Sequence, residues 1–395
     1  MPPTDHSTID SQLALKHVMK LMGIVGKSGH ESKAADYVIK ALLKGGAQAR
    51  FIESDAAHRR SPLGGERGNL VMKLPGTVRG PRRMLSAHLD TVPICVGSQP
   101  RRKGNLVKSA DPTTGLGADN RAGTAVLLTT ALHLLRHRLP HPPLTFCWFV
   151  QEEVGLLGAR YVSKGLLGKP KLAFNWDGGG PTKLTIGATG GYRMQIEIDG
   201  LASHAGGAPE KGISAISIAA LAIADLQQNG WHGLIRKGKH SGTSNVGYIE
   251  GGEATNVVTD RVAIRAEARS HHPGFRKRIV TAIEKAFRQA VKQVPSSDGK
   301  TGQVRIKGRL DYESFRLSKN EPCVQAAQAA VQSLGHSPLL AIANGGLDAN
   351  WITRHGIPTV SLGCGQANAH TVAETLNIRQ YQLACQIALQ LATQT

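Results

Sequence analysis

Short apolar segments with strand character alternate with segments of helical periodicity through the first half of the chain. Helices are predicted at 121–135 and near 156–164, and the strands around them at Asn69–Leu74, Arg83–His88, Thr145–Gln151 and Leu172–Trp176. This alternation is typical of an α/β fold with a mixed, mostly parallel sheet flanked by helices on both faces. Functional groups of such sheets gather at the carboxyl ends of the strands. The residues that follow these strands are therefore the first candidates for a site.

The pattern changes from about Gly190. Residues Tyr192–Asp199 alternate apolar and polar side chains, as a half-buried strand does. A helix, two strands, a helix and a strand are predicted after it, at Ser214–Asn229, Thr243–Ile249, Arg261–Arg269, Gly274–Val294 and Gly302–Leu310. The order β-α-β-β-α-β is that of a ferredoxin-like unit. Because the α/β pattern resumes after Glu321, we expect one domain in two parts, 1–188 and 318–395, interrupted by an inserted domain at 189–317.

The charge of the chain raises a separate possibility. Lys and Arg number 48 against 28 Asp and Glu, which gives a net charge of +20. Such an excess favours nucleic acids or anionic surfaces as partners. The cations are scattered, however, and only 4% of the residues are aromatic, which leaves few side chains to stack on bases. We therefore prefer a solvated basic surface and expect no nucleic-acid partner, and a nucleic-acid-binding protein is the remote alternative.

The cysteines and the apolar segments indicate the compartment. The five cysteines are far apart and form no C-x-x-C pair: Cys95, Cys147, Cys323, Cys364 and Cys385. They are typical of packed or free thiols in a reducing compartment. The first ten residues lack the apolar core of a signal peptide, and the apolar run Ile213–Ala224 is too short to span a bilayer. We expect a cytoplasmic protein without membrane association.

His88 and Asp90 stand at the end of a predicted strand. Two residues apart on an extended segment, their side chains point to the same side. A carboxylate placed there can hold the imidazole in one tautomer and leave the other nitrogen for a metal ion. Taken alone, many H-x-D pairs are simply polar residues at a turn.

Further polar residues follow the other strands, and each has an ordinary structural explanation. Asp119 precedes a predicted helix, where an N-cap is the simplest role. Glu152 and Glu153 follow an apolar strand, and two adjacent like charges cost free energy unless a cation or a shared proton compensates them. Asp177 precedes three glycines, as a turn residue does. His370 lies in a loop before the last helix and is not informative alone.

Together these residues point to one chemistry. Two histidines and three or four carboxylates, without a cysteine, fit zinc, manganese or cobalt. Two such ions polarise a carbonyl and acidify a bound water, and one carboxylate remains as a base. Because the chain contains no G-x-S-x-G elbow and no Walker loop, metal-assisted hydrolysis suits the residues better than nucleophilic catalysis.

Five ordered motifs resemble a known family. The segments SAHLDTV, GADNRAG, QEEVGLLGA, NWDGGG and NAHTVAE look like those of dinuclear zinc exopeptidases related to peptidase T. This family also includes glutamate carboxypeptidase, acetylornithine deacetylase and succinyl-diaminopimelate desuccinylase. The resemblance covers nearly the whole chain, and the segment SHAGGAPEKGISAI is most similar to the peptidase T branch. It implies a zinc-exopeptidase-type catalytic domain with an inserted ferredoxin-like lid or dimerisation domain.

The resemblance assigns roles to the strand-end residues. It implies that Asp90 orients His88 and that Glu152 is the general base, which takes a proton from a water activated by two metal ions. The implied metal ligands are His88 and Asp177 for one ion, Glu153 and His370 for the other, and Asp119 as the bridge. The ions are expected to be zinc, with cobalt or manganese as the alternatives.

Other implied residues concern the substrate and the oligomer. In the lid, His204 matches a histidine that reaches a neighbouring active site to stabilise the oxyanion, and Asn256 and Arg269 match substrate-contacting residues. Gly346 and Asp348 stand in a segment that resembles a glycine-rich loop lining the family's pocket. The resemblance thus implies a homodimer formed through the lid and a short peptide as the substrate.

The leading hypothesis is a metal-dependent aminopeptidase that cleaves the amide bonds of short peptides. The closest alternative is another amide hydrolase of the same architecture, such as an N-acyl amino acid deacylase. Two further alternatives are a nucleic-acid-binding protein, which is remote, and a non-catalytic regulatory relative of the family. The complete set of metal ligands argues against the regulatory relative.

Overall fold

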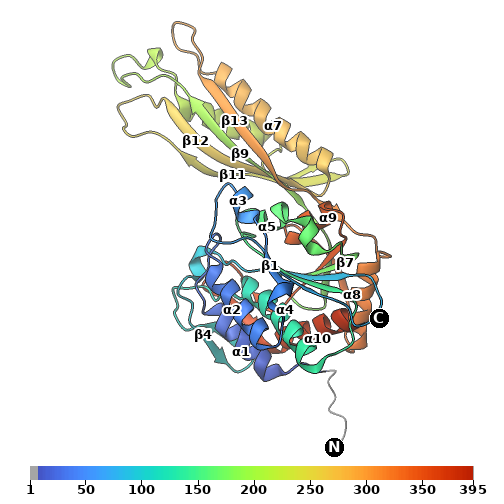
Figure 1. Cartoon of the computed structure of the whole chain (residues 1–395). Coiled ribbons are helices and arrows are strands. Elements are labelled where there is room, and N and C mark those ends of the chain that lie inside the picture. The colour runs from blue at the N-terminus through green and yellow to red at the C-terminus, as the bar shows by residue number, and fades with distance from the viewer. Residues whose placement is uncertain (1–7, 395) are drawn as a thin grey trace, which may run out of the picture. The chain divides into compact units, whose positions relative to one another are not determined.

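The computed structural model describes residues 8–394, which form two compact units (Figure 1). One unit comprises the chain up to Ala188 and from Arg316 onward, and the other comprises Thr189–Phe315. The second boundary lies two residues before the one expected from the sequence. The backbone N–H of the buried Leu317 donates to the carbonyl of Ile186, which ties this residue to the first unit.

The described part of the first unit is built on a nine-stranded mixed sheet. The strands follow the order β1 (Ile52–Ser54), β2 (Leu70–Leu74), β6 (Leu144–Phe149), β3 (Arg83–His88), β7 (Leu172–Trp176), β16 (Thr359–Leu362), β8 (Lys183–Ala188) and β14 (Phe315–Arg316), with β15 (Leu339–Ala343) beside β8. The central strands β6, β3, β7 and β16 are parallel to one another. Their residues are buried at every position. The carboxyl ends of β6, β3 and β7 therefore meet at one edge.

Helices cover both faces of this sheet (Figure 1). One face carries α1 (Ser11–Met22), α2 (Ser32–Lys44), α4 (Ala118–His137), α8 (Pro322–Ser333) and α10 (Ile378–Thr393). The other carries α3 (Ala57–Arg60), α5 (Leu157–Tyr161) and α9 (Asp348–Arg354). Ala159 of α5 and Ile352 of α9 pack in one buried cluster with Met84 and Cys147 of the sheet. The sequence predicted neither α1 nor α9.

Helix α4 lies against the sheet because a glycine allows close approach. A Cβ on Gly123 would lie 2.6 Å from the carbonyl oxygen of Trp176 and 3.0 Å from the Cβ of Ala87. Nearly every residue of α4 from Asn120 to Leu134 is buried, so the helix fills the space between the sheet and the outer helices. This contact brings the first residues of α4 to the carboxyl ends of β3 and β7.

A smaller four-stranded sheet supports the C-terminal loop of the first unit. Its strands follow the order β17 (Gln366–Ala367), β18 (Thr375–Asn377), β5 (Leu106–Ser109) and β4 (Pro100–Lys103). β17 and β18 pair antiparallel and are connected by residues 368–374, which include His370. This sheet has no clear signal in the sequence, because its strands are two to four residues long.

The second unit is an antiparallel sheet covered by two helices. The strands follow the order β10 (Gly233–Lys237), β11 (His240–Glu250), β12 (Arg261–Ser270), β9 (Gly190–Asp199) and β13 (Gln303–Tyr312). α6 (Ala215–Gln228) and α7 (Pro273–Lys292) bury their apolar residues in one cluster with the sheet. This is the predicted ferredoxin-like unit with β10 added at the edge. β10 was missed because Ile235 is its one buried residue.

No helix within residues 8–394 is both long enough and apolar enough to cross a membrane.

Candidate metal centre

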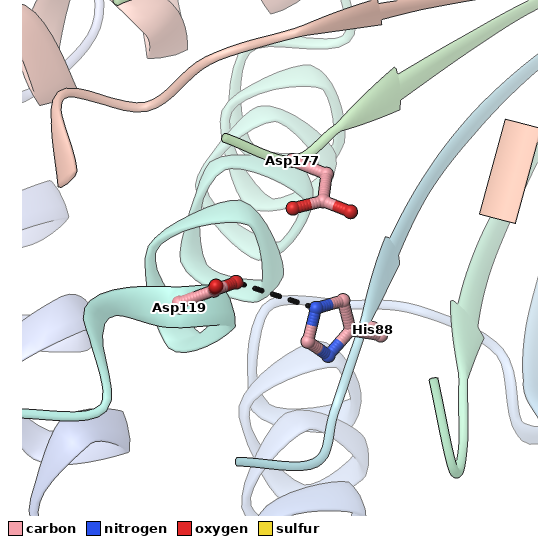
Figure 2. Close-up of side chains that lie close together, drawn as sticks. All are labelled: His88, Asp119 and Asp177. Carbon is pink, nitrogen blue, oxygen red and sulfur yellow. Dashed lines mark ion pairs between the residues drawn. The ribbon is translucent and has the colours of Figure 1, made fainter. Parts of the chain in front are cut away.

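Polar side chains from three neighbouring strands meet at one edge of the sheet. His88 is the last residue of β3, Asp177 follows β7, and Glu152 and Glu153 follow β6 after the two intervening residues Val150 and Gln151. Asp119 comes from the turn that begins α4. Figure 2 shows His88, Asp119 and Asp177 pointing toward one another.

His88, Asp119 and Asp177 form the first candidate ligand group. One ligand atom from each residue lies within 4.8 Å of the others. Nε2 of His88 is 3.4 Å from Oδ1 of Asp119, as the dashed line in Figure 2 marks.

Asp119, Glu153 and His370 form the second group, within the same 4.8 Å limit. Nε2 of His370 lies 3.3 Å from Oδ2 of Asp119 and 3.0 Å from Oε2 of Glu153. Asp119 thus faces one histidine with each of its oxygens. The five residues for which the resemblance implied metal ligation lie together around this shared carboxylate.

Asp90 lies beside His88 and is fully buried. Its Oδ1 is 3.3 Å from Nδ1 of His88, on the side of the ring that faces away from Asp119. A carboxylate in this position favours the tautomer with the proton on Nδ1 and leaves Nε2 free to bind a cation.

Glu152 projects into the same edge. Its Oε2 is 3.9 Å from Nε2 of His88, and the residue is 8% exposed. Burial raises the pKa of Glu152 well above its ordinary value, the positive charge of His88 opposes this shift, and the nearby carboxylates Asp177 and Glu153 add to it. Glu152 also forms a third possible ligand group with His88 and Glu153.

The charges of the cluster fit bound cations. Burial raises the pKa values of Glu153 and Asp177, and the surrounding carboxylates add to both shifts. Burial acts the same way on Asp119, but His370 and His88 hold its pKa below the ordinary value. Oδ1 of Asp119 is buried and accepts no hydrogen bond from the described residues. A group of close carboxylates is stable when cations compensate it, and nitrogen and oxygen donors of this kind suit zinc, manganese or cobalt.

Two residues that the sequence analysis did not single out hold Asp119 in place. Glu374 is buried, and its carboxylate accepts from the backbone N–H of Asp119 at 2.8 Å and of Gly117 at 2.6 Å. Nδ2 of Asn120 donates to the carbonyl of Trp176 at 2.6 Å, which ties the turn to the end of β7. Asn120 lies in the motif GADNRAG and Glu374 in the motif NAHTVAE. Their place inside these motifs was the one signal in the sequence that they belong to the site.

The two residues expected in a pocket-lining loop differ in accessibility. Gly346 is partly exposed, whereas Asp348 begins α9 and is fully buried. Both carboxylate oxygens of Asp348 lack a hydrogen-bond partner among the described residues, and burial raises the pKa of Asp348 to about 7. Asp348 presents no accessible atom in this structure, and its expected contact with substrate stays a prediction. The burial comes from its place at the start of the short helix α9, which packs on the sheet.

The other expected functional residues belong to the second unit. His204 is exposed, and its Nδ1 accepts from the backbone N–H of Gly207 at 2.9 Å and of Gly206 at 3.1 Å. These bonds place the ring proton on Nε2, which is then a donor. Arg269 donates from Nε and Nη2 to the carboxylate of Glu267, at 2.8 and 2.9 Å. Asn256 is exposed, and its backbone carbonyl accepts from the backbone N–H of Ala205.

Several known proteins have similar sequences and structures. The structure of a tripeptidase from Staphylococcus aureus superposes with a TM-score of 0.87 at 30% identity, covering 98% of each chain. That of an aminopeptidase, PepT, from Bacillus cereus gives a TM-score of 0.83 at 30% identity and the same coverage. A dinuclear metal-binding peptidase from Bacillus subtilis shares the fold at a TM-score of 0.69 and 18% identity, covering 97% of each chain.

Sequence comparison gives the same result. The uncharacterized protein YqjE of Bacillus subtilis is 30% identical over 373 residues, which are 94% of this chain and 95% of that protein. A family model described as peptidase family M20/M25/M40 matches residues 84–394, a range that includes every candidate metal ligand. The chain belongs to peptidase family M20/M25/M40.

Proposed function

We propose that this metal-dependent peptide hydrolase is an aminopeptidase that removes the N-terminal residue of short, unblocked peptides. The observation that carries the proposal is the position of Asp119 between the two histidine–carboxylate groups, because a carboxylate that faces both groups can serve two metal ions at once. The names of the two similar solved structures, a tripeptidase and an aminopeptidase, support the choice of substrate.

The ligand groups assign two sets of donors. His88 and Asp177 would hold one divalent ion, Glu153 and His370 would hold the other, and the carboxylate of Asp119 would serve both. Zinc is the proposed metal, with cobalt and manganese as alternatives, because the donors are imidazole nitrogens and carboxylate oxygens. When bound, such a pair polarises the scissile carbonyl and lowers the pKa of the attacking water.

Glu152 moves the protons of the reaction. Its carboxylate takes a proton from the attacking water and passes it to the nitrogen of the leaving amine, so that a single group acts first as base and then as acid. Burial raises the pKa of Glu152, and this favours the form that has just accepted a proton. Asp90 keeps the imidazole of His88 in position throughout.

The second unit is proposed to serve as a lid and as the dimer interface. The exposed His204 would donate from Nε2 to the carbonyl oxygen as negative charge develops on it, in its own subunit or in the partner subunit. Asn256, Arg269 and Gly346 are the proposed substrate contacts. Because Arg269 already binds Glu267, it would act as part of that pair.

The cellular compartment is proposed to be the cytoplasm. All five cysteines are buried and free, which fits a reducing environment.

A substrate screen tests the activity. Metal-free protein is reconstituted with zinc, cobalt or manganese and given matched peptides, such as Ala-Ala-Ala and its N-acetylated form, together with dipeptides and acylated amino acids. We expect release of the free N-terminal amino acid from the unblocked tripeptide and loss of turnover on chelation. Faster cleavage of the acylated amino acids would contradict the aminopeptidase and favour a deacylase.

A further inference from the structure

The turn that carries Glu152 and Glu153 is bound through three successive backbone amides. The N–H of Gln151 donates to Oε1 of Glu31 at 3.0 Å. The N–H of Glu152 donates to Oδ1 of Asp90 at 3.0 Å, and the N–H of Glu153 to Oδ2 of Asp90 at 3.2 Å. Two buried carboxylates therefore hold the backbone from which the proposed base and a proposed metal ligand project.

Glu31 comes from the segment before α2, far from the turn in sequence. The residue is 0% exposed, and the same Oε1 accepts from the backbone N–H of Gly29 at 2.8 Å. In the same segment, Oγ of Ser28 donates to Oδ2 of Asp90 at 2.6 Å. This segment thus binds the turn directly through Glu31, and through Ser28 it binds Asp90, which holds the rest of the turn.

A buried cation stands near these carboxylates. Arg121 is 0% exposed, and its Nη2 donates to the carbonyl oxygens of Gly26 at 3.1 Å and Ile24 at 3.3 Å. Burial lowers the pKa of Arg121 to about 10, and the negative charges of Asp90 and Glu31 oppose this shift. Burial and the negative charge of Asp90 raise the pKa of Glu31 to about 7, and the nearby positive charge of Arg121 acts in the opposite direction.

The turn needs such support because of its backbone conformation. Gln151 has a φ of 55°, in the left-handed region that residues with a side chain rarely adopt. The conformation persists where the surroundings hold it. The side chain of Gln151 accepts from Oγ of Ser61 at 2.6 Å and donates to the carbonyl of Gly64, while Glu31 holds the backbone.

We propose that Glu31 is a positioning residue for catalysis. Its carboxylate fixes the amide of Gln151 and thereby the directions in which the side chains of Glu152 and Glu153 leave the turn. Glu31 reaches the chemistry only through this backbone and touches none of the reacting atoms. The proposal rests on the proposed function for its effect on turnover, but its effect on the turn does not require a known substrate.

Three variants of Glu31 test the role. Glu31→Ala removes the acceptor, and kcat is expected to fall about 10- to 100-fold with KM unchanged, as for other groups that orient a metal site indirectly. Glu31→Gln keeps an acceptor oxygen at the same reach and is expected to recover most of kcat. Glu31→Asp keeps the negative charge, but its shorter side chain moves the carboxylate oxygen away from the amide of Gln151. Its kcat is therefore expected to fall as far as that of the alanine variant. Glu53→Ala is the matched control, since Glu53 is ion-paired with Lys73 on the surface.

Hydrogen exchange of the 150–154 segment gives a readout without substrate. Glu31→Ala and Glu31→Asp are expected to speed exchange there and to leave the exchange of β3 unchanged, and Glu31→Gln to behave as the wild type. If the alanine variant does not fold, the aspartate and glutamine variants still decide the question. Unchanged kcat and exchange in Glu31→Asp would overturn the proposal, and so would a glutamine variant as impaired as aspartate. A wild type inactive on every peptide would overturn the proposed function alone.

Discussion

Nε2 of His370 lies 3.3 Å from Oδ2 of Asp119, although Asp119 belongs to the part of the first unit before the insertion and His370 to the part after it. His370 is carried by the loop between β17 and β18, and Asp119 by the turn that begins α4. Glu374, in the same loop as His370, accepts from the backbone N–H of Asp119. The loop therefore both supplies a ligand and holds the shared carboxylate, which makes Asp119 the centre of the site.

The role of Glu152 is tested by Glu152→Gln, which keeps the shape of the side chain and removes its basicity. We expect turnover to fall about 10²- to 10⁴-fold, as is usual when a general base is lost. The variant should still bind two metal ions, because the five proposed ligands are intact. Steady-state kinetics and elemental analysis of the same sample measure both. Near-normal turnover in the metal-loaded variant would assign the base to another residue.

The role of His204 is tested by His204→Ala. Loss of one oxyanion donor is expected to lower kcat about 10²- to 10³-fold without changing metal content. His336→Ala, at another exposed histidine, is the control and should be fully active.

Subunit mixing tests whether His204 acts across a dimer. If it does, mixing His204→Ala with Glu152→Gln subunits should restore part of the activity, because one of the two sites in each mixed dimer then becomes complete. A stable mixed dimer without recovered activity would show that the second unit closes on its own subunit.

Asp348 makes the stability of the metal-free protein depend on pH. Burial raises its pKa from 3.8 to about 7, so the folded state binds this proton more tightly than the unfolded chain does. The stabilisation is complete below about pH 4 and is lost as the pH rises to about 7, at a cost of about 4 kcal/mol. Asp348→Asn removes this dependence. Urea titrations of the metal-free proteins measure the free energy of unfolding. Between pH 5 and pH 8 we expect this free energy to rise for the variant relative to the wild type. A difference between the two proteins that does not change with pH would disprove the effect.

Metal binding should release protons. Asp119 and Glu153 raise the pKa of His370 to about 10, so in the metal-free protein this imidazole is protonated at pH 8. A metal ion binds the neutral imidazole only, and affinity therefore rises with pH up to that value. Calorimetric titration of zinc in two buffers with different ionisation enthalpies measures the release. An absence of proton release at pH 8 would mean that His370 is not a ligand.

The strand ends were the part of the site that sequence could predict. β3 and β7 were predicted with their observed bounds, because buried central strands are short apolar runs with clear limits. Clear strand limits also identified the residues at the carboxyl ends as candidates for the site. Glu374 and Asn120 lie inside the quoted motifs and Glu31 lies outside them, but none of the three was selected, because they act through backbone amides and carbonyls whose partners are distant in sequence. The added strand β10 and the sheet of β4, β5, β17 and β18 were missed because their few buried residues give no periodic pattern.

The location of the metal ions is the most direct test of the account. Crystals of the zinc-loaded protein, measured with X-rays above and below the zinc absorption edge, show each zinc ion by its anomalous signal. We predict two peaks about 3.5–4 Å apart, one beside His88 and Asp177, the other beside Glu153 and His370, with Asp119 between them. A single peak, or a pair of peaks that does not share Asp119, would contradict the two-metal site.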